Sequence, residues 1–466
     1  MVPQETVMQL NELPAVERAG AMPPSKSQQS LQRRVLELAA PVIGENLLQT
    51  LLGVVDTILV AGLGAVALAG VGSALQVILV LIAALTALSV GASVLVAQAY
   101  GAGDLRAASR YAQQSIVWSV IISIPLAILG LLFSVPILGL FGLEADVTHV
   151  AAQYLHVTLG TVTAIMVLLI GGGVLRGAGD SRTPMLITAF ANILNVSLAY
   201  AMIYGHFGLP AMGAVGSAWA TFLSRLAGAL ILVWVLFRGR NGVRIGRGFS
   251  WRPQLHVARD VLRIGLPAAL EEMLVIMAFA TLTPIVAGLG TVSLAAHRVV
   301  INVLSLSFLP GIGFGLAATA LVGQSIGARK PQEARAITRI ALRWAIIWMG
   351  ALGAIFIFFA PQIMSLYTDD PQMIAQGAAG IRVVALAQPL WAGTFVFAGA
   401  LRGTGNTRLP LVITGVAMWA VVAIGWLAVT FVYPSLTAVW TAFLLVGPFE
   451  TAGFALAWRW WRRTIQ

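Results

Sequence analysis

The first long apolar stretch of the chain contains two acidic side chains, which are the residues best suited to carry chemistry. Glu45 and Asp56 are eleven residues apart, close to three turns of a helix, and Gln49 lies one turn beyond Glu45. In a helix these side chains form a polar stripe on one face, with Asn46 at its edge. Because an ionisable group inside a membrane costs at least ~2.5 kcal/mol, we expect the stripe to face a bundle interior or a wet cavity.

Asp56 is the strongest candidate for ion coupling. The chain repeats itself at a constant shift, which takes Pro41 to Pro267 and Asp56 to Leu282, so only one half has this acid. A purely structural acid could be present in both halves, whereas an ion-coupling acid is needed only once. In low-dielectric surroundings such a carboxylate could bind and release a proton near neutral pH. The alternative is a carboxylate satisfied by local hydroxyls or amides that serves only packing.

Other acids occupy a position that is repeated in both halves. Glu45 and Glu271 are counterparts, each four residues after a proline, and Glu272 is the counterpart of Asn46. We expect these acids to lie in the inner half of the membrane. They could attract a cationic substrate, or they could form a structural polar contact where the halves meet, and the sequence leaves both interpretations open.

The composition argues against several classes of protein. Only 10% of the 466 residues are charged, against roughly 25% in soluble proteins, and 59% are hydrophobic. Cysteine is absent, which excludes disulfides and thiolate metal sites. The net charge of +11 comes from arginines in short loops, not from a basic face that alternates with aromatic residues, so nucleic-acid binding is not expected. The five histidines are scattered and no catalytic motif is present, so we predict neither an enzyme nor a bound cofactor.

Twelve apolar runs predict an all-α integral membrane protein with twelve transmembrane helices, six in each half. The runs fall at about 35–61, 68–99, 112–141, 149–172, 184–205, 210–237, 261–287, 292–324, 338–361, 372–400, 409–432 and 436–458. We predict an N-lobe at 35–237, a basic cytoplasmic linker at 238–260 and a C-lobe at 261–460. Residues 1–34, which are polar and rich in Pro, Gln and Ser, are predicted to be a disordered cytoplasmic tail, and 461–466 a second tail. Arginines gather in alternate loops, in the linker and at the C-terminus, which places both termini in the cytoplasm.

Short motifs recur at the same constant shift. Gln98 and Gly101 return as Gln324 and Gly327, and the Leu-Arg-Gly-x-Gly motif at 175–179 returns at 401–405. Six spans in each half bring both halves into the membrane from the same side, so the repeat is parallel. A doubled helical scaffold favours a transporter in which one half moves against the other. We interpret the glycine-rich turns as structural, because they lack the Lys and Ser/Thr of a phosphate loop.

These residues resemble the multidrug and toxic compound extrusion (MATE) family of bacterial transporters over nearly all of residues 35–460. The motifs that carry the resemblance are Val55-Asp56-Thr57 after Pro41, Gly265-Leu266-Pro267, Leu294-Ala295-Ala296-His297 and Val322-Gly323-Gln324-x-x-Gly327. The resemblance implies a two-lobe multidrug antiporter of the cytoplasmic (inner) membrane. Such a protein exports organic cations and other amphipathic compounds in exchange for inward-flowing H⁺ or Na⁺. We expect small-molecule substrates and the lipid bilayer as partners, and a monomer.

Carried over residue by residue, the resemblance assigns cation coupling to Asp56, with Asn195 in the fifth span and Ser217 and Thr221 in the sixth facing the same pocket. Gln49 joins this set because it lies on the polar stripe. Where the family often has Asp or Asn four residues after the fifth-span asparagine, this chain has alanine. The missing oxygen ligand favours protons over Na⁺.

The resemblance also covers acids of the C-lobe. The NorM-type branch uses acids in the seventh and tenth spans, but these positions are Val275 and Trp391 here, so that site is not reproduced. We expect substrate contacts from aromatic and sulfur-containing side chains, since aromatic faces attract cations, although packing is an equally simple role. The predicted substrate-binding residues are Glu45, Glu271, Glu272, Met273, Met277, Phe279 and Trp391.

Two other functions remain open from the sequence. A lipid-linked oligosaccharide flippase of the same superfamily would need several basic residues facing a central cavity, for which only Arg225, Arg298 and Arg382 are candidates. An intramembrane enzyme would need a catalytic set that converges in space, for example Asp56 and His156 with a metal ion.

Overall fold

The computed structural model describes residues 31–139, 141–246 and 248–464, which form helices and the loops between them. The predicted tail at residues 1–30 and the end of the second tail, 465–466, lie outside this part of the chain. The helices are α1 (Leu31–Ala61), α2 (Ala65–Gly101), α3 (Leu105–Gly139), α4 (Ala145–Gly160), α5 (Val162–Gly177), α6 (Arg182–Tyr204), α7 (Ala214–Arg238), α8 (Leu255–Ala287), α9 (Thr291–Gly327), α10 (Pro331–Ser365), α11 (Pro371–Gly403), α12 (Arg408–Leu427), the short π-helix η2 (Ala428–Val432) and α13 (Leu436–Thr464).

Eleven of the described helical segments are each long and apolar enough to cross a membrane. The helices α4 and α5 together form one further span, the fourth along the chain, which brings the number to twelve. They meet at an angle of 49° around Thr161. Thr158 and Thr161 donate hydrogen bonds to helix carbonyls one turn earlier, and Gly160 is a weak helix former, which together favour a bend. The predicted all-α fold with twelve spans in two lobes is confirmed, and its fourth span is broken.

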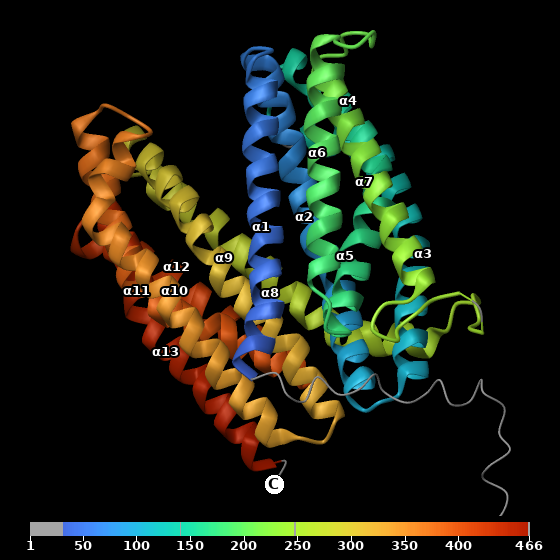
Figure 1. Ribbon diagram of the computed structural model, residues 1–466. Coiled ribbons are helices and arrows are strands. Elements are labelled where there is room, and N and C mark those ends of the chain that lie inside the picture. Colours follow the sequence, from blue (N-terminus) through green and yellow to red (C-terminus); the bar gives the residue numbers. More distant parts are fainter. Residues whose placement is uncertain (1–30, 140, 247, 465–466) are drawn as a thin grey trace, which may run out of the picture.

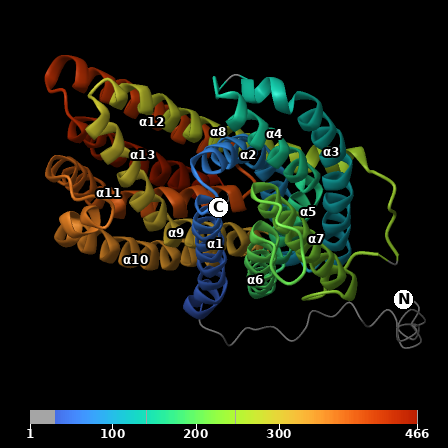
Figure 2. The same cartoon turned by 90° about the horizontal axis from the view of Figure 1, so that it is seen from above.

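The two lobes converge at one end of the molecule and diverge at the other (Figure 1). The N-lobe comprises α1 to α7 and the C-lobe comprises α8 to α13. The arginine-rich linker, the start of α1 and the end of α13 all lie at the convergent end (Figure 1). Seen from above, α1 lies between the two groups of helices (Figure 2). We call the convergent end the closed end and the other the open end.

The first helix of each lobe begins in the core of the other lobe. Val35 and Leu38 of α1 belong to the hydrophobic cluster of the C-lobe. Val257 and Val261 of α8 belong to the cluster of the N-lobe. The predicted lobe limits at 35 and 261 therefore follow the chain but not the packing. In addition, α1 begins at Leu31, within the segment predicted to be the first tail.

The linker between the lobes is hydrogen-bonded to α3. The side chain of Gln113 accepts a hydrogen bond from the Gly246 amide, and the side chain of Gln114 donates to the carbonyls of Ser250 and Arg252. Both glutamines are buried. Since α7 ends at Arg238 and α8 begins at Leu255, the connecting segment is shorter than the predicted 238–260 and is held in place.

Candidate functional site

Asp56 lies on the last part of α1, close to the open end. The hydroxyl of Ser217 on α7 donates to its carboxylate at 2.8 Å. The Asp56 side chain is half-buried, and within the described part of the chain no arginine, lysine or histidine forms an ion pair with it. Asp56 is therefore neither locked in a salt bridge nor fully exposed at the surface, as a proton-binding role requires.

A second group of hydrogen-bonded side chains lies between α6 and α7 of the N-lobe. The side-chain amide of Asn195 on α6 donates to the hydroxyls of Thr221 at 3.1 Å and Ser224 at 3.2 Å on α7. The carbonyl oxygen of the Asn195 side chain is buried and accepts no hydrogen bond within the described residues. It leaves an acceptor available to a water molecule or to a protonated acid.

Tyr154 on α4 lies close to both groups of side chains. The residue is 1% exposed, and its hydroxyl lies near Ser217 and Thr221 and interacts electrostatically with Asp56. Tyr154 was not predicted, because it carries no charge and its position near the start of the predicted span 149–172 does not by itself distinguish it. We call Asp56, Tyr154, Asn195, Ser217 and Thr221 the N-lobe polar cluster.

The repeated acids form the same contacts in both lobes. In the N-lobe, Glu45 accepts from Arg176 at 3.1 Å and from Thr188 at 3.4 Å. In the C-lobe, Glu271 lies 2.8 Å from Arg402, and its carboxylate accepts from Thr414 at 3.2 Å. All three members of each set are repeat counterparts. Of the two interpretations left open by the sequence, these contacts agree with a structural one, except that each contact stays within its own lobe.

A small cavity of about 110 Å³ opens beside the ion pair of the N-lobe. Its polar lining consists of Glu45, Gln49, Arg176, Thr188 and Arg225. Gln49 therefore shares a cavity with Glu45, and it makes no described contact with the N-lobe polar cluster. Glu45 is partly buried, whereas Gln49 is exposed although it lines this cavity.

The predicted substrate-binding residues of the C-lobe divide into two groups. Trp391 is buried and lies edge-on to Phe443 at 5.9 Å, and Phe279 stacks on the same ring at 5.7 Å. Glu272 and Met277 are exposed, and Met273 is half-buried. The exposed face of α8 is thus open to a ligand, whereas the aromatic residues fill the C-lobe interior. Substrate contact by these residues stays a prediction.

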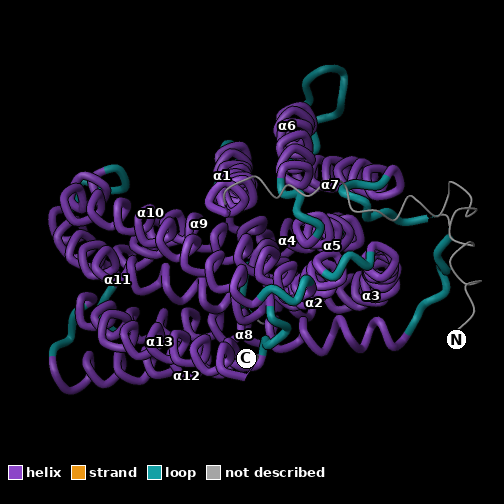
Figure 3. The backbone as a smooth tube through the Cα atoms, turned by 60° about the horizontal axis from the view of Figure 1, so that its bottom comes forward, coloured by secondary structure: helices purple, strands orange, loops and turns teal. Residues whose placement is uncertain are grey.

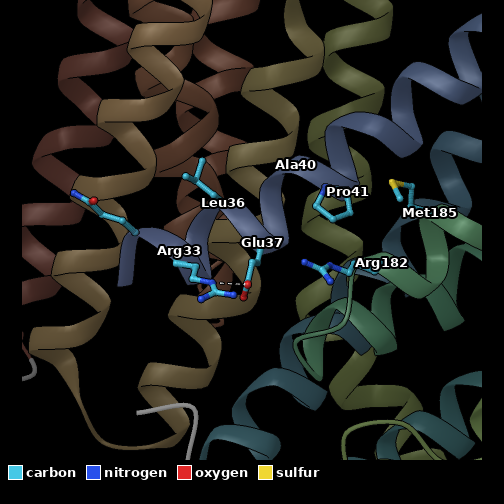
Figure 4. Close-up of a pocket in the computed structure, with 8 residues that line it drawn as sticks. Arg33, Leu36, Glu37, Ala40, Pro41, Arg182 and Met185 are labelled. Carbon is cyan, nitrogen blue, oxygen red and sulfur yellow. Dashed lines mark hydrogen bonds and ion pairs between the residues drawn. The ribbon is translucent and has the colours of Figure 1, made fainter. Parts of the chain in front are cut away.

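A second and larger hollow lies at the closed end, where α1 separates from α6 (Figure 4). Its volume is about 660 Å³. Arg33 and Glu37 on α1 form an ion pair at 2.9 Å on one side, while Pro41 and Met185 form part of the wall. The part of α1 that precedes Pro41 packs against the C-lobe. This course of α1 leaves the hollow between α1 and α6.

The described residues contain no group of three His, Cys, Asp or Glu side chains that could hold a metal ion. In the N-lobe polar cluster Asp56 is the single carboxylate, and its companions are neutral hydroxyls and an amide. Two like lobes of apolar helices, each with its own ion pair, together with a half-buried acid on α1 near the open end, are the features of a membrane transporter.

Comparison with known proteins supports this class. The MatE family model matches residues 41–201 and again residues 267–427, so it finds the two halves at the shift that relates the repeated motifs. The chain belongs to the MatE family. It is therefore a multi-pass transporter and not an enzyme, as the resemblance implied.

Individual relatives agree over most of their length. A probable multidrug resistance protein NorM of Thermotoga maritima is 35% identical over 85% of both chains. The multidrug resistance protein NorM of Burkholderia vietnamiensis is 30% identical, over 87% of this chain and 88% of its own. A solved structure of a multidrug resistance MATE family transporter in an outward-facing conformation is 26% identical, with a TM-score of 0.88 over 94% of this chain and 97% of that one.

Proposed function

We propose that the chain is a secondary multidrug antiporter that exports amphipathic organic cations in exchange for protons by alternating access. The observation that carries this proposal is the unpaired Asp56 carboxylate in the N-lobe polar cluster, close to the open end. Further support comes from family membership and from relatives named as multidrug resistance proteins.

The coupling step is a protonation. With the open end facing outward, a proton from outside binds a carboxylate oxygen of Asp56 and neutralises it. The acid then no longer accepts strongly from Ser217 and instead becomes a donor, for which the free oxygen of Asn195 is a neighbouring acceptor in the N-lobe polar cluster. This change alters the contact of α1 with α6 and α7, and the lobes rock to face inward. There Asp56 releases the proton to the cytoplasm and the cargo binds.

Protons fit the polar cluster better than Na⁺ does. A sodium ion needs several oxygen ligands at once, whereas a proton needs one lone pair. The cluster offers a single carboxylate, and position 199, one turn beyond Asn195, is a buried alanine that offers no side-chain oxygen. One charge moved through 100 mV supplies about 2.3 kcal/mol, which is enough to drive accumulation when combined with a pH gradient.

The cargo contacts lie on the exposed face of α8. Glu272 supplies a negative charge there, and Met273 and Met277 supply a polarisable apolar surface that adapts to different ligands. Such a surface suits planar or amphipathic cations of varied shape. The protein acts as a monomer in the cytoplasmic membrane. The start of α1 and the end of α13 lie at the same end as the arginine-rich loops, so we place both termini in the cytoplasm.

The proposal is tested by efflux of a fluorescent cationic dye and a fluoroquinolone from proteoliposomes under an imposed ΔpH or ΔNa⁺. The native protein is expected to respond to ΔpH alone. Asp56→Asn is expected to abolish ΔpH-driven efflux while it still binds the dye. Asp369→Asn, which removes an exposed acid from a loop at the open end, serves as the matched control. Undiminished ΔpH-driven efflux by Asp56→Asn would remove Asp56 from the mechanism.

A further inference from the structure

Two hydrogen bonds join the lobes at the closed end. In one the donor belongs to the N-lobe, and in the other the donor belongs to the C-lobe. The side-chain amide of Gln98 on α2 donates to the carbonyl of Gly403, the last residue of α11, at 3.0 Å. The side-chain amide of Gln324 on α9 donates to the carbonyl of Gly177, the last residue of α5, at 2.9 Å. Figure 3 turns this end of the molecule toward the reader. We call these four residues the amide latch.

The latch is built from motifs that the internal repeat duplicates. Gln98 and Gln324 are counterparts, and so are Gly177 and Gly403 in the two Leu-Arg-Gly-x-Gly motifs. Each half thus contributes one donor and one acceptor, and each bonds to the other half. The function proposed above uses neither the glutamines nor the glycine-rich turns, although both are present twice.

Glycines beside the latch allow the two helices to touch through their backbones. A Cβ atom at Gly101 of α2 would overlap the backbone carbonyl of Gln324, and a Cβ atom at Gly327 of α9 would overlap that of Gln98. Both glycines have ordinary helical φ angles, so they are needed for space and not for backbone conformation. Any larger residue at either position would prevent this closed contact.

The chemistry of the latch suits repeated opening and closing. Carbonyls at the C-terminus of a helix have no partner within the helix, and among the described residues no backbone amide donates to Gly177 or Gly403. The glutamine amides satisfy these acceptors when the end is closed, and water can do so when it is open. Because all four groups are neutral, separation exposes no unpaired charge.

An ion pair at the same end is a contact of a different kind. Arg34 of α1 and Glu333 of α10 form an ion pair, and both side chains are partly exposed. Their counterparts are Asp260 and Ala107, so no second copy of this pair is possible. The latch is the polar contact that the repeat preserves.

We propose that the amide latch is the gate of the closed end, and that its two hydrogen bonds set the ratio of outward-facing to inward-facing molecules. The proposal rests on the proposed function, because it requires that the lobes alternate. Gln98 and Gln324 are positioning residues in this scheme, and they touch neither proton nor cargo. Closure of this end is lost when both bonds break and α2 slides off α9.

The test measures distances across both ends of the molecule in lipid nanodiscs. Because the chain has no cysteine, pairs of introduced cysteines can carry spin labels without background. Arg106→Cys with Gln332→Cys reports on the closed end, and Ala65→Cys with Thr291→Cys reports on the open end. All four positions are exposed, and the members of each pair are repeat counterparts.

Removal of one latch bond, in Gln98→Ala or Gln324→Ala, is expected to raise the inward-facing fraction relative to the outward-facing one by about fivefold. This factor corresponds to about 1 kcal/mol for one net hydrogen bond. The double variant is expected to shift the ratio by about 25-fold, with longer distances at the closed end and shorter ones at the open end. Gln362→Ala, an exposed glutamine on α10, is expected to change neither distance.

A steric variant tests the same contact without touching the hydrogen bonds. Gly101→Ala adds a methyl group that overlaps the Gln324 backbone when the closed end is closed and not when it is open. It is therefore expected to raise the ratio of inward-facing to outward-facing molecules at least as far as the double glutamine variant does. Gly72→Ala on the same helix has no neighbouring atom within 4 Å and is the control. A monodisperse elution profile and an unchanged melting temperature for the glutamine variants show that they are folded.

Unchanged distance distributions in the double glutamine variant would overturn the proposal. So would a shift caused by one glutamine and not by its counterpart, because the two bonds are equivalent. The distances are measured without cargo or an ion gradient, so their outcome is separate from the efflux experiment. If the ratio responds to the latch variants while the native protein shows no ΔpH-driven efflux, the gate stands and the proton coupling fails.

Discussion

Asp56 of the N-lobe has Leu282 as its repeat counterpart in the C-lobe. The neighbouring side chains are polar around Asp56 and apolar around Leu282. Asp56 accepts a hydrogen bond from the Ser217 hydroxyl of α7, whereas Leu282 is fully buried in the apolar core of the C-lobe. One turn of helix thus carries the titratable group in one lobe and plain packing in the other. The ion pairs Glu45–Arg176 and Glu271–Arg402 are the same in both halves, whereas position 56 differs. We place the coupling of protons to cargo at this position.

Tyr154 gives the first prediction at this scale. Tyr154→Phe removes the hydroxyl that lies near Ser217 and Thr221 and leaves the buried ring in place. Loss of one net hydrogen bond from the network is expected to slow ΔpH-driven efflux by about fivefold, with little change in melting temperature. Tyr200→Phe, on an exposed tyrosine of α6, is the control. Equal efflux by both variants would exclude Tyr154 from the coupling network.

The inner ion pairs give the second prediction. Arg176→Met removes the ion-pair partner of the partly buried Glu45 and leaves Arg225 as the remaining cation in the shared cavity, so a loss of about 1–3 kcal/mol is expected. A fall in melting temperature is therefore expected. The double variant with Glu45→Gln is expected to recover part of it, since the carboxylate that lost its partner is then neutral. If the double variant is no more stable than Arg176→Met, the pair does not contribute through its charges.

The sequence was sufficient to identify part of the candidate site. The resemblance to the family grouped Asp56 with Ser217, Asn195 and Thr221, and the structure pairs Asp56 with Ser217 and Asn195 with Thr221. Gln49 was assigned to the same set but lines the neighbouring cavity with Glu45. Contacts that depend on how one helix is rotated against another, such as that of Tyr154, leave no periodic trace in a single sequence.

At the scale of the helices, length and apolarity predicted the number of spans and most of their limits. The break between α4 and α5 was not predicted, because it arises from hydroxyl-to-backbone bonds and a glycine within an otherwise continuous apolar run. The exchange of α1 and α8 between the lobes was not predicted either. The inner ends of these helices are apolar on the side that packs, and an apolar face does not specify which lobe covers it.

The turn between α5 and α6 gives the third prediction. Asp180 accepts hydrogen bonds from Thr183 and from Arg240 of the linker, the latter at 2.6 Å. Burial alone would raise the pKa of the Asp180 carboxyl, but the bonds from Thr183 and Arg240 outweigh it and hold the pKa below its usual value. A lowered pKa in the folded state means that this carboxylate stabilises the protein fully above about pH 4 and progressively less as the pH falls through the lowered value.

Asp180→Asn is therefore expected to lower the stability at pH 7 by about 1.5–3 kcal/mol, the range for a hydrogen bond to a charged group. It is also expected to flatten the loss of stability below about pH 4, since the titrating group is gone. Melting curves of the purified protein between pH 3 and pH 7 check both expectations. Parallel pH profiles for the variant and the native protein would show that Asp180 does not fasten the linker.

On the scale of the whole molecule, the repeat explains both the symmetry and the asymmetry of the structure. The family model matches twice at one shift, and the inner ion pairs and the amide latch follow the same shift. The symmetric elements hold each lobe together and hold the lobes against each other. The asymmetric elements, Asp56 in one lobe and Glu272 on the exposed face of α8 in the other, are those to which we assign proton and cargo.

The last prediction concerns the orientation of the molecule in the membrane. The closed end has the arginine-rich loops, and positive charge in short loops stays on the cytoplasmic side, so the closed end is expected to face inward. In intact cells a membrane-impermeant maleimide should label Thr291→Cys at the open end but not Arg106→Cys at the closed end. In inverted vesicles the pattern should reverse. Labelling of Arg106→Cys in intact cells would place the open end inside, and Asp56 could then not take its proton from outside while the lobes are arranged as they are here.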